Sequence, residues 1–344
     1  MLKQFGGQLK KEDKLSFARS ERWNGKVFEN YSKTTMDMSL KTLPGLIQEN
    51  FKGRKHRGPK QNLPITPFNS DLFKKDDELK FVWYGHSAVL LQIDNKNLLI
   101  DPMLGPDASP IGPVRTKRYS EGSLDVIDSL PKIDAVLLTH DHYDHLDLKS
   151  IEKLKPKVDT WLVGLGIGRH LIKWGIPKEQ ITEFDWWEEK SFKDLGLVFT
   201  PSRHFSGRGL TDRAKSLWGG WVIQGKAEKV YWSGDGGYDT HFKKIGERFG
   251  PFNLGFIECG QYHKLWHEIH MYPEESVQAA IDSKVEKTVP VHWGGFTLAL
   301  HNWKESIDRF VAKAEKEKVL FLTPNLGEVA HSNSDTKLWW KDFD

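Results

Sequence analysis

The sequence has a single cysteine, Cys259, among its 344 residues. One cysteine excludes an intramolecular disulfide and a cysteine-rich zinc site, and it fits either a reducing compartment or simple indifference to redox state. No stretch approaches the roughly 20 consecutive apolar residues that a membrane-spanning helix needs. The first residues also lack the apolar run of a secretory signal peptide. These absences lead us to expect a soluble, cytoplasmic protein, for which peripheral contact with a membrane stays open.

An excess of charge of one sign is also missing. The formal net charge is only +3 although 28% of the residues are charged, and the chain has no long basic stripe. Neither feature favours attraction to the phosphates of nucleic acid, so we expect no nucleic-acid partner. Aromatic residues are plentiful by contrast, with 14 tryptophans and 19 phenylalanines. Such side chains suit a core, an apolar substrate groove or an interfacial surface.

The most informative stretch is a short apolar run followed by a polar loop. Residues 135–138 are aliphatic or β-branched, which predicts a buried strand. A lone histidine in a loop is more often solvated than metal-bound, but three histidines and an aspartate within six positions favour metal binding. Imidazole nitrogens and carboxylate oxygens are common ligands of zinc. The residues concerned are His140, His142, Asp144 and His145.

Other expected strands end in the same types of residue. Each of these strands is short and apolar and runs into a polar or glycine-rich loop. In open α/β sheets, sites form at the carboxyl ends of the strands, so we expect these residues to meet the histidine loop. The strands are residues 97–100, 197–201, 229–232 and 288–291, and they lead to Asp101, His204, Asp235 and His292.

Two metal sites follow from this set. Asp235 has two carboxylate oxygens and can bridge two ions, while Asp101 is either a partner of a metal-binding histidine or a simple turn residue. Ions held about 3.5–4 Å apart can share a water, lower its pKa toward neutrality and yield a hydroxide nucleophile. We expect two Zn2+ ions, although the same ligands accept Mn2+ or Fe. His140, His142 and His204 would surround one ion, and Asp144, His145 and His292 the other.

Strands and helices alternate along most of the chain, which predicts the α/β class. Residues 1–78 are polar and show little periodicity apart from one expected helix at 40–51, so we interpret them as an arm packed on the main domain. Residues 79–344 are expected to form the catalytic domain. Its expected strands are 79–84, 88–93, 97–100, 135–138, 160–163, 197–201, 218–224, 229–232, 254–258, 288–291 and 319–322, and its expected helices are 148–154, 168–174, 240–249, 274–283 and 303–318.

The candidate ligands occur in the order found in the metallo-β-lactamase superfamily, which the sequence resembles from about Phe81 to Pro324. The signature His-x-His-x-Asp-His stands at 140–145. The resemblance implies an αββα sandwich, in which two mixed β-sheets are flanked by helices. It also implies hydrolysis at a binuclear metal centre, with Asp144 and Asp235 as catalytic residues.

A closer resemblance is to the branch that contains N-acylphosphatidylethanolamine-hydrolysing phospholipase D. In that branch a tyrosine of the metal loop and a histidine before a Pro-Glu-Glu helix contact the lipid head group, which implies substrate-binding roles for Tyr143 and His270. The implied activity is a phosphodiesterase of the phospholipase D type acting on such phospholipids. The segments that carry the resemblance are 85–90, 139–147, 200–205, 217–221, 233–238, 248–252, 270–275 and 292–294.

Two other functions stay open on the sequence. Sugar-phosphate lactonases are similar to this branch and share its metal ligands, so the substrate is either a lipid or a small polar ester. The second is metal binding without turnover. Arg203, Arg208 and Arg213 could bind a phosphate or be surface charges, and His86 is expected to be structural beneath the site. The aromatic residues and the family resemblance are also compatible with a homodimer.

Overall fold

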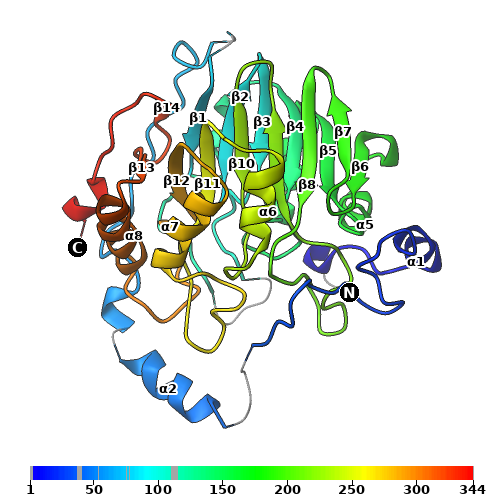
Figure 1. The fold of residues 1–344 in the computed structure, drawn as a ribbon, viewed down its shortest axis with the longest axis horizontal. Helices are drawn as coiled ribbons and strands as arrows, with labels where there is room; N and C mark the ends of the chain where they lie inside the picture. The colour runs from blue at the N-terminus through cyan, green and yellow to red at the C-terminus, as the bar shows by residue number, and fades with distance from the viewer. Residues whose placement is uncertain are drawn as a thin grey trace.

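Two seven-stranded β-sheets form the centre of the protein (Figure 1). The computed structural model describes residues 3–36, 41–52, 54–74, 76, 78–109 and 115–343. In spatial order, the first sheet holds β14 (Val329–His331), β1 (Lys80–Trp83), β2 (Val89–Ile93), β3 (Lys96–Ile100), β4 (Ile133–Leu138), β5 (Val158–Gly164) and β6 (Ile181–Phe184). The second holds β13 (Leu320–Phe321), β12 (Lys287–Val291), β11 (Leu254–Glu258), β10 (Lys229–Trp232), β9 (Gly220–Gln224), β8 (Leu195–Thr200) and β7 (Glu189–Phe192).

Both sheets are mixed. In the first, β14, β1, β2 and β3 pair antiparallel, whereas β3 to β6 pair parallel. In the second, β7 to β10 pair antiparallel and β10 to β13 pair parallel. The parallel part of each sheet places several strand ends at the same edge, which is the arrangement that the candidate site requires.

The central strands of each sheet are buried on both faces. Alternate residues of a strand face opposite sides because the pleat has a period of two. In β4, Ala135 and Leu137 belong to the apolar core between the sheets, whereas Val136 and Leu138 belong to a core on the outer face of the first sheet. Strands that bury both faces appear in a sequence as continuous apolar runs. This explains why apolar runs marked the central strands in the sequence.

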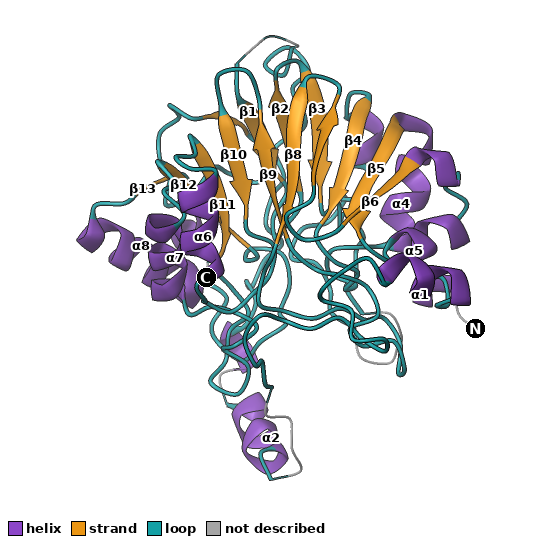
Figure 2. Cartoon of the chain, turned by 45° about the vertical axis from the view of Figure 1, so that its right-hand side comes forward, coloured by secondary structure: helices purple, strands orange, loops and turns teal. Residues whose placement is uncertain are grey.

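Helices cover the outer faces (Figure 2). Leu154 and Leu171 pack on the first sheet, and Ile245 and Ala279 pack on the second. The arrangement is therefore the expected αββα sandwich. The helices are α1 (Lys11–Phe17), α2 (Leu43–Phe51), α3 (Val126–Ser129), α4 (Leu148–Leu154), α5 (Gly168–Lys173), α6 (His241–Arg248), α7 (Pro273–Asp282) and α8 (Glu305–Glu317). Within the described ranges, none of them has the length and apolar character to cross a bilayer.

The N-terminal arm contributes to the same core as the sheets. Phe17, Phe28 and Leu63 are buried in the apolar cluster between the two sheets. Helix α2, by contrast, lies away from both sheets, beyond the loops (Figures 1 and 2). It matches the helix expected at 40–51 from Leu43 onward, and Leu40 lies outside the described residues.

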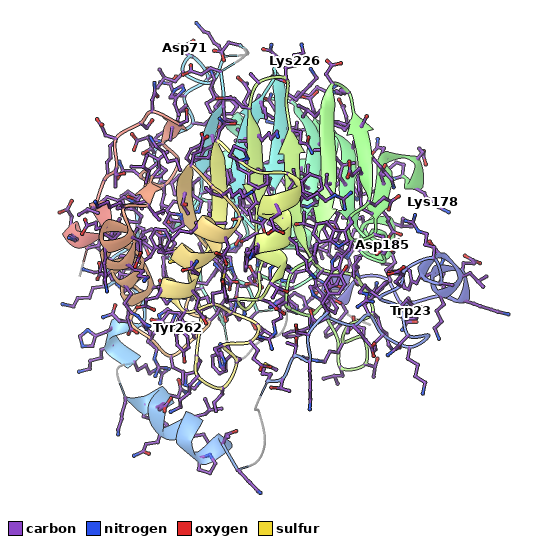
Figure 3. The ribbon with its side chains drawn as sticks, viewed as in Figure 1. Trp23, Asp71, Lys178, Asp185, Lys226 and Tyr262 are labelled. Carbon is purple, nitrogen blue, oxygen red and sulfur yellow. The ribbon has the colours of Figure 1, made fainter. Side chains whose placement is uncertain are left out.

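The loops that follow β3, β4, β8, β10 and β12 gather at one end of the sandwich (Figure 2). Figure 3 shows Tyr262 at this end of the molecule and Lys226, in the turn between β9 and β10, at the opposite end. The candidate site therefore lies among loops that a rigid pair of sheets holds in place.

Candidate metal centre

The strand ends bring all seven predicted metal ligands together. Strands β4, β8, β10 and β12 end shortly before the predicted side chains. The nitrogen and oxygen atoms of these side chains form overlapping groups in which the atoms lie within 4.8 Å of one another. The groups are His140, His142 and His204; His140, His145 and Asp235; and Asp144, His145 and His292 together with His86.

The first group consists of three imidazoles. Nδ1 of His142 lies 2.9 Å from Nε2 of His140 and 3.2 Å from Nε2 of His204. His204 donates its Nδ1 proton to the carbonyl of Ile269 at 2.9 Å, which leaves its Nε2 lone pair available as a ligand. Three imidazole nitrogens that converge on one point form a common zinc-binding set.

Asp235 lies between the first group and the second. Its Oδ2 is 3.0 Å from Nε2 of His145 and 3.8 Å from Nε2 of His140. Its Oδ1 is 3.2 Å from Nδ1 of His292. The same Nε2 of His145 is 3.6 Å from Oδ2 of Asp144. A carboxylate in this position can offer one oxygen to each of two ions, as the bridging role requires.

Asp101 holds the ring of His145, one of the predicted ligands. Its Oδ2 lies 2.9 Å from Nδ1 of His145 and accepts from the hydroxyl of Thr139 at 2.7 Å. Its Oδ1 accepts from the backbone N–H of Thr139 at 2.8 Å. An acid that holds the far nitrogen of a metal-binding histidine fixes both the tautomer and the orientation of the ring. The structure thus places Asp101 where the sequence predicted a supporting residue.

The chain's own atoms leave part of this cluster unsatisfied, which fits a metal site. His292 is buried, and its Nε2 has no hydrogen-bond partner among the described residues. Buried polar atoms in proteins almost always have a partner, so this atom suits a ligand that the chain does not supply. The donor set of imidazoles and carboxylates matches zinc, manganese and iron.

Burial and mutual proximity set the charges in the cluster. Burial lowers the pKa of His140, His204 and His292 well below the ordinary value, so these rings stay neutral with a lone pair to offer. Burial raises the pKa of Asp144 and Asp235, but the neighbouring histidines outweigh it and hold both pKa values well below the ordinary value. The carboxylates are therefore ionised.

His86 contacts two of the predicted ligands, Asp144 and His292. Its Nε2 lies 2.9 Å from Oδ2 of Asp144, and its ring centroid is 4.1 Å from that of His292. Its backbone φ is 56°, and its N–H donates to the carbonyl of Trp293 at 2.7 Å. His86 thus occupies a tight turn beside Asp144 and can orient that carboxylate.

The two predicted substrate contacts have different surroundings. The hydroxyl of Tyr143 donates to the carbonyl of Arg208 at 2.6 Å, and its ring lines a neighbouring cavity. His270 lines the cavity that contains the ligands, with its ring centroid 5.0 Å from that of His204 and 5.3 Å from that of His292. Substrate contact stays a prediction for both residues, and the structure favours His270.

The three candidate arginines also differ. Arg208 is buried and its guanidinium donates to backbone carbonyls, so it is not available to a substrate. Arg203 lies 3.2 Å from a carboxylate oxygen of Glu268. Arg213 is exposed, and its guanidinium lies 3.7 Å from the ring centroid of Phe205. The carbonyls that Arg208 binds belong to Gln4, Asp141 and Leu146.

Glu258 is a further residue beside the cluster that was not predicted from the sequence. This side chain is completely buried at the end of β11, where it accepts a hydrogen bond from Gly236 N–H at 2.6 Å and contacts Nδ1 of His270. Burial raises the pKa of Glu258 above its ordinary value, and the charge and hydrogen bond of His270 oppose that rise. Burial lowers the pKa of His270, but the Glu258 carboxylate outweighs it and the net shift is upward. An acid that ends an apolar strand was the available signal, since the same rule located the ligands.

The cavity beside the ligands has a volume of about 280 Å³. His142, Asp144, His204, Asp235 and His292 form its polar floor. Most of the remaining lining is apolar and comes from the arm and from three separate loops. These wall residues are Met36, Phe205, Gln261, Trp266, Ile269 and Leu298. The arrangement can hold a polar reacting group against the ligands and an apolar group beside it.

Known proteins share this sequence and fold. A family model described as the β-lactamase superfamily domain matches residues 96–293. An uncharacterized protein of Mycobacterium tuberculosis is 38% identical over 294 residues, which cover 83% of this chain and 78% of that protein. An N-acyl-phosphatidylethanolamine-hydrolyzing phospholipase D of Caenorhabditis elegans is 30% identical over 341 residues, which cover 91% of this chain and 94% of that protein.

Solved structures agree at the level of the fold. A metallo hydrolase from the archaeon Ignicoccus hospitalis superposes with a TM-score of 0.56 at 21% identity, over 75% of this chain and 99% of that one. An isothiocyanate hydrolase from Delia radicum gut bacteria gives 0.56 at 21% identity, over 73% and 98%. The sequence match, the sandwich and the convergent histidines and aspartates together show that the chain belongs to the metallo-β-lactamase superfamily of hydrolases and resembles its phospholipase D branch.

Proposed function

We propose that this protein is a binuclear metal-dependent phosphodiesterase of the phospholipase D type, which hydrolyses phospholipids similar to N-acylphosphatidylethanolamine. The observation that carries the proposal is the composition of the cavity. Its floor offers ligands for two ions, whereas Met36, Phe205, Trp266, Ile269 and Leu298 form an apolar wall beside them. A small polar ester would gain little from such a wall, but a lipid would bury its acyl chain there.

The similarity to the Caenorhabditis elegans protein supports the same conclusion. That protein is named for hydrolysis of N-acyl-phosphatidylethanolamine, and the alignment covers 91% of this chain. The lengths of the two proteins also agree, because the alignment covers 94% of the relative. The fold alone would suit many hydrolases, so the substrate is inferred from the relative and from the apolar wall together.

The chain's own residues would act as follows. Zinc ions, or manganese or iron, would be held by the seven predicted ligands and would supply Lewis acidity and an activated water. Asp144, held by His86 at 2.9 Å, would orient the attack on phosphorus. His270 would donate a hydrogen bond to a phosphate oxygen. The apolar wall would exclude bulk water and hold the acyl chain.

Turnover by the metal-loaded protein tests the proposal. N-acylphosphatidylethanolamine in mixed micelles would be compared with a panel of phosphorylated lactones, and metal content would be assayed on the same sample. We expect release of phosphatidic acid and of the N-acylethanolamine, with little lactone opening. The variant Asp235→Asn should lose nearly all activity, whereas Asp194→Asn, an exposed aspartate remote from the cavity, should keep it.

Each alternative gives a different result in this assay. Lactone opening without phosphatidic acid would retain the metal centre and reject the lipid. Bound metal without turnover of either class would indicate a binding protein. A fully active, metal-replete Asp235→Asn enzyme would reject the bridging role of Asp235.

A further inference from the structure

Glu258 is a buried acid whose position the metal ligands do not explain. The preceding residues of β11, from Leu254 to Ile257, are apolar or glycine, and the Glu258 side chain has no solvent exposure. A buried carboxylate is costly unless hydrogen bonds stabilise it. Two groups do so: the N–H of Gly236 donates to Oε2 at 2.6 Å, and Oε1 contacts Nδ1 of His270.

The backbone of Glu258 is fixed as well. Its N–H donates to the hydroxyl of Ser233 at 3.0 Å, and the neighbouring N–H of Cys259 donates to the carbonyl of Val291 at 2.9 Å. Glu258 therefore sits on a rigid strand end between the loops that carry Asp235 and His292. A side chain supported in this way can hold another group in a defined orientation.

The group that it holds is His270. The imidazole ring is nearly parallel to that of His292, with an interplanar angle of 13°, and it meets His204 edge to face. His270 lines the cavity. Its Nδ1 is engaged by Glu258, while its Nε2 makes no hydrogen bond within the described part of the chain. The two nitrogens lie on different sides of the ring, so Nε2 is left for a molecule in the cavity.

We propose that Glu258 is a positioning residue, which accepts from the Nδ1–H of His270 and so holds the ring with its Nε2–H donating to an oxygen of the bound phosphate group. The inference rests on the proposed function for the identity of the substrate, and on the geometry alone for the Glu258–His270 pair. Acids in metal and catalytic sites often orient a histidine by accepting its ring proton. Here the oriented histidine is His270, which lies outside the seven predicted metal ligands.

A third cation site is the rival interpretation. Single ligand atoms of Asp235, Glu258, His270 and His292 lie within 4.8 Å of one another. In the hydrogen-bonded pair the Nδ1–H of His270 donates to Oε1 of Glu258, whereas in a cation site both atoms would be unprotonated ligands. Metal content distinguishes the two, since the pair predicts two equivalents in the wild type and in Glu258→Gln.

Nuclear magnetic resonance of the ring nitrogens tests the pair without reference to turnover. In the metal-loaded wild type we expect the 15N signals of His270 to show a proton on Nδ1, and inorganic phosphate to shift the Nε2 signal. Glu258→Gln should alter the Nδ1 signal and weaken the response to phosphate at least threefold. An unprotonated Nδ1 in the wild type would overturn the proposal, even if the variant failed to fold.

Kinetics test the consequence. We expect Glu258→Gln and His270→Ala each to lower kcat/KM by about 10- to 100-fold. The double variant should be no worse than His270→Ala alone, because Glu258 acts only through that ring. Glu183→Gln provides the control: this carboxylate accepts from two backbone N–H groups away from the cavity, and its loss should leave kcat/KM within twofold.

The outcomes separate this inference from the proposed function. If kcat/KM of the double variant fell by the product of the two single losses, Glu258 would act independently of His270 and the proposal would be overturned. If the wild type bound three metal equivalents and Glu258→Gln bound two, the proposal would be overturned and a third cation site would be indicated. If the wild type released no phosphatidic acid but the phosphate response of His270 depended on Glu258, the lipid substrate would fail and the positioning role would stand.

Discussion

Asp101 controls how His145 meets a metal ion. The Asp101 carboxylate accepts from the ring N–H of His145 and from the backbone N–H of Thr139. Asparagine has the same shape, but its NH2 group would face one of these two donors and could not accept from it. We expect Asp101→Asn to weaken binding of one metal equivalent by about 10- to 100-fold, the usual effect of losing such a supporting acid. A chelator competition titration that resolves the two equivalents measures this.

The control for Asp101 is Asp134→Asn. Asp134 also accepts from a backbone N–H, that of Asn97 at 2.9 Å, but it lies at the other end of the same sheet. Its replacement should leave both metal affinities unchanged. Equal affinities in Asp101→Asn and the wild type would show that His145 does not need this support.

Residue types at strand ends were sufficient to predict where the ligands meet. A histidine or aspartate after an apolar run is an unusual pattern, and the parallel sheet places such residues together. The same argument could not reveal the bond from Tyr143 to the carbonyl of Arg208, because the path of an irregular loop leaves no periodic signal. Glu258 ends an apolar strand and so carried the same signal, but its contact with His270, which a separate loop brings near, could not be seen in the sequence.

At the scale of elements, close packing of backbone depends on Gly234. This residue has a φ of +63°, and a Cβ built on it would lie 2.2 Å from the carbonyl oxygen of Gly219. We expect Gly234→Ala to lower the free energy of unfolding by more than about 2 kcal/mol, from backbone strain and from the displaced strand. Urea unfolding of the metal-free protein measures the change.

The control variant Gly122→Ala separates the cost of backbone strain from the cost of the close contact with Gly219. Gly122 has a similar φ of +69°, but no heavy atom lies within 4 Å of its added Cβ. Only the backbone cost of about 1–2 kcal/mol should therefore appear. If both substitutions were equally destabilising, the contact with Gly219 would not matter.

His241 should make helix α6 sensitive to acid. Burial lowers its pKa to about 4, its Nε2 has no partner among the described residues, and it begins a helix whose dipole disfavours a cation. In the unfolded chain His241 binds a proton near pH 6.5, whereas in the folded protein it does so only near pH 4. The free energy of unfolding therefore falls as the pH drops from about 6.5 toward 4. Between pH 7 and pH 5 this single group should remove about 2 kcal/mol.

Comparison with His241→Gln isolates this contribution. Denaturant unfolding of both proteins at pH 7 and pH 5 gives two differences, and groups common to both cancel. The wild type should lose about 2 kcal/mol more than the variant. Parallel pH profiles would show that His241 is protonated in the folded protein.

Elements in the interior were predictable, and three strands at sheet edges were not. The strands that the sequence did not predict are β6, β7 and β14, and each of them is an outermost strand of its sheet. In β7 the side chains are partly or fully exposed, so no apolar run marks it. An edge strand of this kind is defined by pairing with its neighbour, as β7 pairs with β8, and not by its own composition.

At the scale of the whole molecule, the two-sheet topology could not come from periodicity. Local patterns predicted the class and most elements, but the division into two sheets came from the family resemblance. The role of the arm was also only partly foreseen. Phe17 and Phe28 enter the core between the sheets, which requires contacts between segments far apart in sequence. No local signal encodes such contacts.

Arg208 links the beginning of the chain to the metal loop. Its guanidinium donates to the carbonyl of Gln4 at 2.8 and 3.1 Å, of Asp141 at 2.6 Å and of Leu146 at 2.7 Å. The cation is thus shared between the N-terminal segment and both ends of the loop that holds three histidines. Lysine keeps the charge but cannot reproduce the planar fork that makes these bonds at once.

We expect Arg208→Lys to lower the free energy of unfolding by about 2 kcal/mol, because buried carbonyls lose their donors. Hydrogen exchange should rise together in the N-terminal segment and in residues 141–146, and metal affinity should fall with it. Arg213→Lys is the control, since the guanidinium of that exposed residue lies over the ring of Phe205 and makes no hydrogen bond or ion pair within the described ranges. Faster exchange in the N-terminal segment alone, with the metal loop unchanged, would show that Arg208 fastens the arm without supporting the metal centre.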